Sequence, residues 1–250
     1  MNSQELRILF EDEHLIAVDK PAGIHTAPLE PGETGTLLSL VMERYPEVGG
    51  LPGIKSVEPG LLHRLDWETS GLVMVARTER SFRALREQFD SDRVSKEYSA
   101  VCAQTAEASE EDRRLRIESR FAPYGPGSKM VRVVLPEEKR KRFSQRASPD
   151  IYTTEIVSIR SRHDTAFTES GNFVLVQARL TRGFRHQVRA HLAFLGFPII
   201  GDPLYGAAVP AGFPERMYLH ASKIELVHPE SGKPLSIKSP LPPEFKKILK

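Results

Sequence analysis

Short apolar and β-branched runs of strand length recur along the whole chain, and they constrain its fold more than any other feature. Residues of these kinds favour strands. The runs that we predict to be strands lie at 6–10, 15–18, 72–76, 97–102, 130–135, 151–159, 173–180, 197–200, 223–227 and 235–238. Apolar residues at helical spacing, with capping or stop residues, predict helices at 36–45, 81–90 and 185–195.

The predicted helices are few and do not alternate regularly with the strands, which argues against a parallel βαβ architecture. We therefore predict an α+β protein built on a large, mixed, mostly antiparallel sheet with flanking helices and loops. The 250 residues suit one large domain or two small ones, and we expect one domain over residues 1–250. The polar segments 139–150 and 161–172 are candidate loops.

Several classes of protein are disfavoured by the composition. No apolar run approaches the roughly 20 residues of a membrane helix, and the first residues lack the pattern of a signal peptide. We therefore expect a cytoplasmic protein that does not enter a membrane. The single cysteine, Cys102, excludes an internal disulfide and a cysteine-rich zinc site, and its strand context indicates a buried structural thiol.

Charge is distributed unevenly although the net charge is only +2. No aspartate or glutamate occurs between Gly171 and Gly201, and a second basic run covers 139–142 with Arg146 nearby. The arginines of the acid-free segment are Arg179, Arg182, Arg185 and Arg189. Such segregation can create a basic face for a polyanion, while ordinary solvated surface charge explains the 139–142 run equally well.

A carboxylate, Asp66, lies in a polar turn directly before the apolar run at 72–76. A loop that is held by a rigid strand is a common place for a reactive side chain. Taken alone, however, this pattern is more often a turn aspartate that bonds to its own backbone.

The surrounding residues, His63-Arg64-Leu65-Asp66-Trp67-Glu68-Thr69-Ser70-Gly71, are similar to the signature His-Arg-Leu-Asp-x-x-Thr-Ser-Gly of RluA-type pseudouridine synthases. Three further stretches resemble that family's motifs in the same order: 9–23, 96–101, and 186–192 with 196–206. Four motifs in one order are highly specific, and the resemblance covers roughly residues 6 to 245.

The sequence departs from the family pattern in two places. Before the last predicted helix the family usually has Thr-Gly-Arg-x-His-Gln, whereas this chain has Phe184 at the position of that arginine, between Arg182 and Arg185. Many relatives also carry a small RNA-binding domain ahead of the catalytic one. Because the first motif begins here at Leu9, a separate N-terminal RNA-binding domain is not expected.

The resemblance implies isomerisation of uridine to pseudouridine in structured RNA, either ribosomal or transfer RNA, in a fold with a central cleft. It implies no cofactor and no metal, and we expect a monomer. Asp66 would be the catalytic carboxylate, acting by covalent attack or by assisting proton loss at the ribose. Arg189 would face it and keep it ionised, because burial alone raises a carboxylate pKa. Tyr98 would stack on the target uracil.

The remaining candidate site residues would bind the substrate. Arg64 would fill the space of the extruded nucleotide or hold a phosphate, and Leu192 would form an apolar wall of the pocket. Arg182 and Arg185 would bind the RNA backbone. His63 belongs to the same substrate-binding loop, and we expect it to organise that loop by hydrogen bonding. We expect His186 to do the same for the predicted helix at 185–195.

Three other interpretations compete with this one. A synthase of the neighbouring RsuA type is disfavoured by Thr69-Ser70-Gly71 and His186-Gln187. A non-catalytic RNA-binding protein on the same fold would not need a buried acid. An aspartate-dependent hydrolase would need a second carboxylate; Glu68 is near in sequence, but in a tight turn we expect its side chain to point elsewhere.

Overall fold

A computed structural model describes residues 6–105, 116–137, 144–161 and 173–248. The predicted basic run at 139–142 and most of the predicted loop at 161–172 lie outside these residues. The chain divides into two compact units, of which the first comprises Met1–Lys96 and His220–Pro240, and the second Glu97–Leu219 and Leu241–Lys250. The prediction of one catalytic domain stays a prediction.

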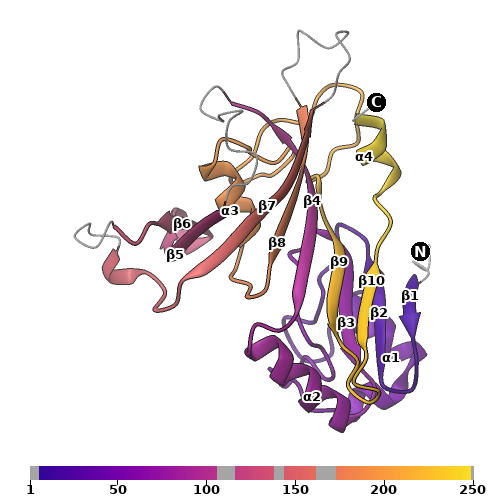
Figure 1. The fold of residues 1–250 in the computed structure, drawn as a ribbon. Coiled ribbons are helices and arrows are strands. Elements are labelled where there is room, and N and C mark those ends of the chain that lie inside the picture. The colour runs from indigo at the N-terminus through magenta and orange to yellow at the C-terminus, as the bar shows by residue number, and fades with distance from the viewer. Residues whose placement is uncertain (1–5, 106–115, 138–143, 162–172, 249–250) are drawn as a thin grey trace. The chain divides into compact units, whose positions relative to one another are not determined.

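The first unit is built on strands β1 (Ile8–Glu11), β2 (Leu15–Lys20), β3 (Ser70–Ala76), β9 (Leu219–Val227) and β10 (Pro234–Lys238) (Figure 1). They are hydrogen-bonded in the order β1-β2-β3-β9-β10. The pairs β1–β2, β2–β3 and β9–β10 are antiparallel, and β3 pairs with β9 in parallel. The helices of this unit are α1 (Leu37–Arg44), the 3-10 turn η1 (Pro46–Gly50) and α2 (Glu79–Asp90).

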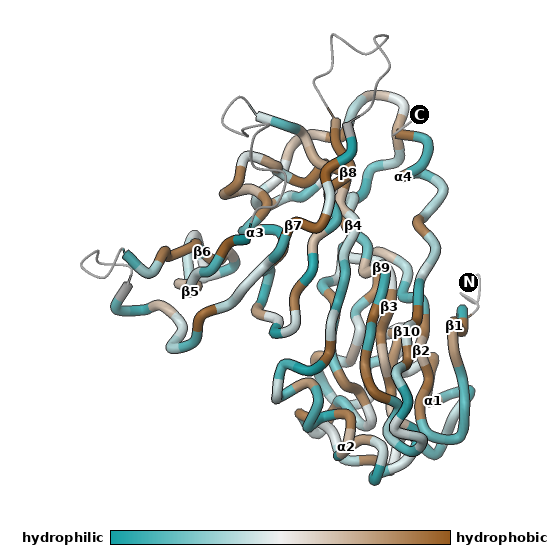
Figure 2. Tube along the Cα trace, in the orientation of Figure 1, coloured by the Kyte–Doolittle hydropathy of each residue, from teal (hydrophilic) through white to brown (hydrophobic). Residues whose placement is uncertain are grey.

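Local sequence explains why these elements form. Thr36 caps α1: its hydroxyl accepts a hydrogen bond from the Ser39 amide, and the Ser39 hydroxyl accepts one from the Thr36 amide. Every residue of β3 is buried, as its apolar run predicts. Hydrophobic residues are interspersed with hydrophilic ones along α2 (Figure 2), and Phe82, Leu85 and Phe89, which recur at helical spacing, are buried.

The second unit contains β4 (Ser95–Ala103), β5 (Arg116–Tyr124), β6 (Met130–Val134), β7 (Tyr152–Ser161) and β8 (Phe173–Leu180). Their order is β4-β8-β7-β5-β6, and the pairs β7–β8, β5–β7 and β5–β6 are antiparallel. The helices are α3 (Gln187–Phe194) and α4 (Pro243–Ile248), with 3-10 turns η2 (Pro126–Ser128) and η3 (Ser144–Arg146).

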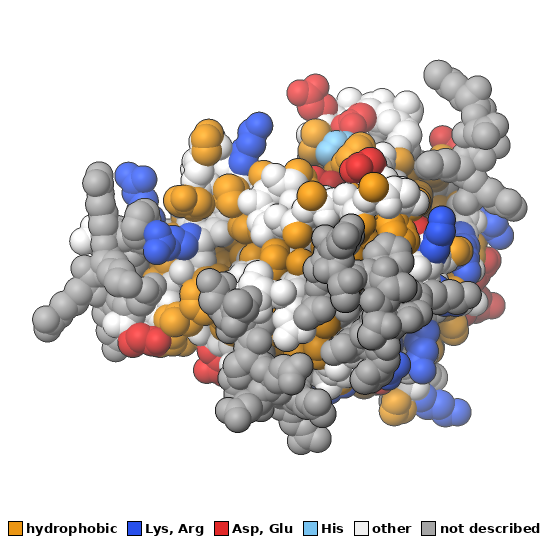
Figure 3. Space-filling model, turned by 90° about the horizontal axis from the view of Figure 1, so that it is seen from above, with side chains coloured by type: hydrophobic (Ala, Val, Ile, Leu, Met, Phe, Trp, Pro, Cys, Tyr) orange, Lys and Arg blue, Asp and Glu red, His pale blue; other side chains and the backbone are white. Residues whose placement is uncertain are grey.

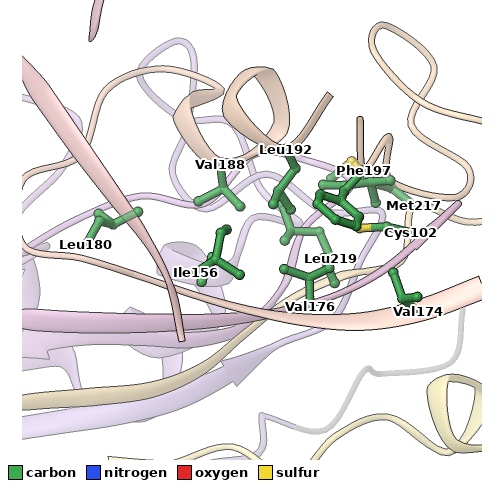
Figure 4. Packing of buried hydrophobic residues seen from close by; sticks show 13 residues of the cluster. Cys102, Ile156, Val174, Val176, Leu180, Val188, Leu192, Phe197, Met217 and Leu219 are labelled. Carbon is green, nitrogen blue, oxygen red and sulfur yellow. The ribbon is translucent and has the colours of Figure 1, made fainter. Parts of the chain in front are cut away.

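The main hydrophobic cluster of the second unit joins α3 to β7 and β8. Figure 4 shows Val188 and Leu192 of α3 pointing toward Ile156 and Val176. Cys102 is a buried free thiol in this cluster, as predicted, and burial raises its pKa. Packing against strands therefore fixes the helix that carries Arg189.

The predicted fold class is confirmed: the chain is α+β, with few helices and a large, mostly antiparallel sheet. The strand predicted at 197–200 is wrong, since Ile199 and Ile200 form only isolated bridges. Strand β5 and helix α4 were not predicted. Within the described residues, no helix is both long and apolar enough to cross a membrane.

Candidate active site

Asp66 lies in the loop between the buried residues Leu61 and Leu62 and the start of β3. Its side chain is half-buried, and its carbonyl accepts a hydrogen bond from the Thr69 amide at 3.1 Å, which closes a turn. The conformation of this loop decides where the carboxylate points, so the contacts that fix its backbone matter most.

Thr26 fixes the residue before Asp66. Its hydroxyl donates to the Leu65 carbonyl at 2.8 Å and accepts from the Leu65 amide at 3.1 Å. Thr26 is only 3% exposed. A single buried hydroxyl therefore satisfies both backbone groups of Leu65, from a segment 39 residues earlier in the chain.

Lys20 and Gly23 fix the residue after Asp66. The Trp67 carbonyl accepts from the Gly23 amide at 2.8 Å and from Lys20 Nζ at 3.3 Å. The fully buried ammonium of Lys20 also donates to the carbonyls of Pro21 and Ile24, both at 2.9 Å. Gly23 has a φ of 84°, which an L-residue adopts only with strain. Asp66 is thus held between two anchored neighbours.

His63 organises the same loop from the other side. Its Nε2 accepts a hydrogen bond from the Met74 amide at 3.1 Å, and its ring stacks on Phe89. Burial, together with the charges of Lys96 and Arg86, lowers the pKa of His63 to about 3. The ring is therefore neutral at physiological pH and ties the loop to β3.

Arg64 is half-exposed and is tethered by an ion pair. Its Nη1 donates to Glu58 Oε1 at 2.7 Å, and the Glu58 side chain is 2% exposed. The guanidinium therefore stays beside the Asp66 loop, while 46% of the Arg64 side chain remains exposed to solvent.

In the second unit, Arg189 forms a bidentate ion pair with Asp202. Arg189 Nε donates to Oδ2 at 2.7 Å and Nη2 to Oδ1 at 2.8 Å, and both side chains are buried. Burial acts to raise the pKa of Asp202, but the hydrogen bonds and charge of Arg189 outweigh it and hold that pKa below its usual range. No role was predicted for Asp202 from the sequence.

A buried polar network orients α3. The Ser119 hydroxyl lies 2.8 Å from His191 Nε2, and the Thr154 hydroxyl lies 2.8 Å from His191 Nδ1. Gln187 donates to the Thr154 hydroxyl and accepts from the Phe184 amide. Burial lowers the pKa of His191 to about 3, so this ring is also neutral. The network links α3 to β5 and β7.

Tyr98 and Leu192 belong to one cluster. Tyr98 lies on β4 and is partly buried, and it packs against the hydrophobic cluster that contains the fully buried Leu192. The structure therefore brings together two of the residues that were assigned to the target base.

The turn before α3, where Phe184 replaces the family's arginine, is packed against the second unit. Phe184 stacks on Phe121, with ring centroids 5.1 Å apart and an interplanar angle of 7°. Arg182 pairs with Asp150 at 2.9 Å, and Arg185 donates to the Ser128 carbonyl at 2.7 Å. Both arginines are therefore held within the second unit.

Lysine and arginine side chains on the face seen in Figure 3 are dispersed among acidic and hydrophobic ones. Among the side chains that this view colours by type, lysines and arginines do not merge into one patch, and the basic face stays a prediction.

Residues 14–194 match the model of a family described as RNA pseudouridylate synthase. The chain belongs to this family. The ribosomal large subunit pseudouridine synthase D of Xanthomonas campestris is 31% identical over 98% of the chain and 68% of its own length. An uncharacterized RNA pseudouridine synthase of Chloroflexus aurantiacus is 33% identical over 93% of the chain and 65% of its own length. The chain thus spans about two thirds of these relatives, and the RluA-type resemblance is confirmed.

Two solved human structures share the fold. RNA Pseudouridylate Synthase Domain Containing 1 has a TM-score of 0.68 at 20% identity, over 95% of this chain and 84% of its own. RNA Pseudouridylate Synthase Domain Containing 4 has a TM-score of 0.66 at 21% identity, over 96% of this chain and 90% of its own. Family membership makes the chain an isomerase that converts uridine to pseudouridine in RNA.

Proposed function

We propose that this synthase modifies a uridine of large-subunit ribosomal RNA and uses Asp66 as its catalytic carboxylate. The observation that carries the proposal is the anchored loop: Thr26 holds Leu65, and Lys20 with Gly23 holds Trp67. Fixing both neighbours of a reactive group in advance reduces the entropic cost of reaching the reactive geometry.

The reaction sets the demands on Asp66. The bond from N1 of uracil to C1′ of the ribose breaks, the base turns, and a bond from C5 to C1′ forms, while C5 loses a proton and N1 gains one. An ionised carboxylate can attack C1′ or assist proton loss from the ribose. Both routes need Asp66 to be charged at neutral pH, in a site that buries a base.

Arg189 is the proposed cation for this carboxylate. Asp202 binds the edge of the guanidinium formed by Nε and Nη2. A guanidinium has five N–H donors in a plane and can serve two carboxylates at once. On this proposal Asp202 sets the orientation of Arg189, and Arg189 keeps Asp66 ionised.

The other site residues are proposed to receive the base and the RNA backbone. Tyr98 stacks on the target uracil, with Leu192 in the apolar wall behind it. Arg64 takes the space that the extruded nucleotide leaves. Arg182 and Arg185 contribute to phosphate binding, which makes affinity fall with salt. The enzyme is proposed to act as a monomer in the cytoplasm.

The ribosomal substrate comes from the names of relatives such as the Xanthomonas enzyme. Pseudouridine mapping of ribosomal and transfer RNA tests it, in cells that lack the gene and are re-supplied with wild type, Asp66→Asn or Glu68→Gln. Glu68 is the matched control, because it is a half-buried carboxylate in the same turn. We expect one or more ribosomal sites to disappear, to return with wild type and Glu68→Gln, and to stay absent with Asp66→Asn.

Other outcomes would redirect the proposal. A dependent site in transfer RNA would replace the ribosomal substrate. If no site depended on the gene while the purified protein still bound RNA, the non-catalytic RNA-binding interpretation would take over.

A further inference from the structure

The residue that follows Asp66 is the only tryptophan of the chain. Trp67 is 49% exposed. Single exposed apolar residues are common on protein surfaces and usually need no explanation. This one differs by its position, because it directly follows the proposed catalytic carboxylate of an enzyme whose substrate is RNA.

The conformation of Trp67 is set by buried contacts although its ring is exposed. Its carbonyl accepts from the Gly23 amide at 2.8 Å and from Lys20 Nζ at 3.3 Å. The six-membered ring lies beside Gly23, since a Cβ atom added at that glycine would stand 3.9 Å from Trp67 Cζ2 and 4.0 Å from Cη2. The indole is thus positioned before any ligand arrives, which lowers the entropic cost of a contact.

The turn geometry gives Trp67 a direction of its own. The Thr69 amide donates to the Asp66 carbonyl at 3.1 Å, so Trp67 occupies the second position of a four-residue turn. Consecutive side chains of a turn leave the backbone in different directions. The indole is therefore not expected to point in the same direction as the Asp66 carboxylate.

We propose that Trp67 is a stacking platform for the nucleobase next to the target uridine. Extruding a uridine removes a stacking partner from its neighbour in the RNA. A preset indole offers that neighbour an aromatic face, which accepts any base because every base has a π-face. Trp67 is then a substrate-binding residue that tolerates several neighbouring bases. The inference rests on the function proposed above for Asp66.

Intrinsic fluorescence tests the contact directly, because Trp67 is the only tryptophan in the protein. The probe is an RNA transcript that carries the uridine identified by pseudouridine mapping. It is added to the Asp66→Asn protein while binding is followed separately by gel shift. We expect saturating RNA to quench the emission and to reduce the access of acrylamide to the indole. Unchanged emission and unchanged acrylamide access at full binding would overturn the proposal.

Kinetics with the active enzyme give a second test. Trp67→Leu keeps an apolar side chain but removes the ring, and we expect it to raise KM roughly tenfold, as the loss of one base–aromatic stack predicts, with little change in kcat. Trp67→Phe keeps a ring and should stay close to wild type. Phe194→Ala is the matched control, because Phe194 is an aromatic residue of similar exposure, at 52%, that is not one of the proposed site residues.

An abasic nucleotide next to the target uridine completes the test. It should raise KM for the wild-type enzyme by a similar factor and add nothing further in Trp67→Leu, because both changes remove the same contact. Additive effects, or a wild-type KM for Trp67→Leu, would overturn the stacking role. If Asp66→Asn were fully active, the proposed function would fail instead, and these measurements would still report on Trp67.

Discussion

Each unit of the molecule buries a cation beside the proposed catalytic machinery, and the two cations are satisfied in different ways. Lys20 in the first unit donates to three backbone carbonyls, one of which belongs to Trp67. Arg189 in the second unit is bound by the carboxylate of Asp202. Carbonyl dipoles replace the hydration of a charge, whereas a carboxylate also neutralises it. The loop of Asp66 should therefore depend on several modest hydrogen bonds, and the orientation of the Arg189 side chain on its ion pair with Asp202.

Removing the carboxylate partner of Arg189 should have the largest effect. Asp202→Asn removes the carboxylate charge that binds Nε and Nη2 of the buried guanidinium, and we expect the free energy of unfolding to fall by about 3 kcal/mol. The exposed pair of Arg182 and Asp150 offers a matched control, for which Asp150→Asn should cost less than about 1 kcal/mol. Urea denaturation measures both changes, and equal losses would contradict the importance of the buried pair.

The two neutral histidines, one in each unit, should make the fold less stable in acid. The pKa values of His63 and His191 are lowered to about 3, whereas an unfolded histidine titrates near 6.5. The unfolded state therefore binds protons that the folded state does not, and stability falls as pH drops below about 6.5. Each histidine should lower the free energy of unfolding by about 2 kcal/mol as the pH falls from 6.5 to 5.

NMR titration of the histidine rings checks this directly. We expect the resonances of both rings to show no midpoint between pH 5 and 8 while the protein stays folded. A midpoint in that range for either ring would show that its burial does not hold it neutral.

Removing the Thr26 hydroxyl, which fixes Leu65 directly before Asp66, should have an intermediate effect. Thr26→Val removes the hydroxyl that serves both backbone groups of Leu65, and we expect a loss of about 2 kcal/mol in unfolding free energy. Because the loop would lose its preset geometry, kcat should fall more than KM rises. Thr26→Ser keeps the hydroxyl and should restore kcat. A Thr26→Ser variant as impaired as Thr26→Val would point to packing rather than hydrogen bonding.

Restoring the family's arginine in the turn before α3 should have the smallest effect on stability. Phe184→Arg removes a ring that packs on Phe121 and Tyr152, and the lost stacking alone should lower the free energy of unfolding by about 1 kcal/mol. The new cation should strengthen RNA binding at low salt. It should also increase the slope of log Kd against log salt concentration by about the amount that one phosphate contact contributes. An unchanged salt dependence would mean that this turn does not face the RNA backbone.

Local patterns were sufficient to predict most of the fold. The alternating and apolar runs predicted β8 at its observed bounds and β3 within two residues, because those strands are buried along most of their length. Strand β5 was missed, since charged residues alternate with Ile117, Ser119 and Phe121 and mask its buried face. Helix α3 begins later than predicted because His186 adopts a left-handed conformation with a φ of 57°.

The site was less predictable than the fold. The motif around Asp66 indicated the loop, but not the contacts that hold it, because Thr26 and Lys20 act across 39 and 47 residues. Asp202 was missed for the same reason, although a charged residue that follows the apolar run at 197–200 indicates a buried partner. Local periodicity reports which face is buried, and it does not report which distant polar group satisfies a buried charge.

Release of the C5 hydrogen tests most directly whether Asp66 carries out the isomerisation of uridine. Forming the bond from C5 to C1′ expels that hydrogen, so RNA labelled with tritium at C5 of uridine releases label to water on each turnover. We predict release with the purified wild-type protein and with Glu68→Gln, and none above background with Asp66→Asn, although that variant still binds the RNA. Release by Asp66→Asn at the wild-type rate would contradict the account.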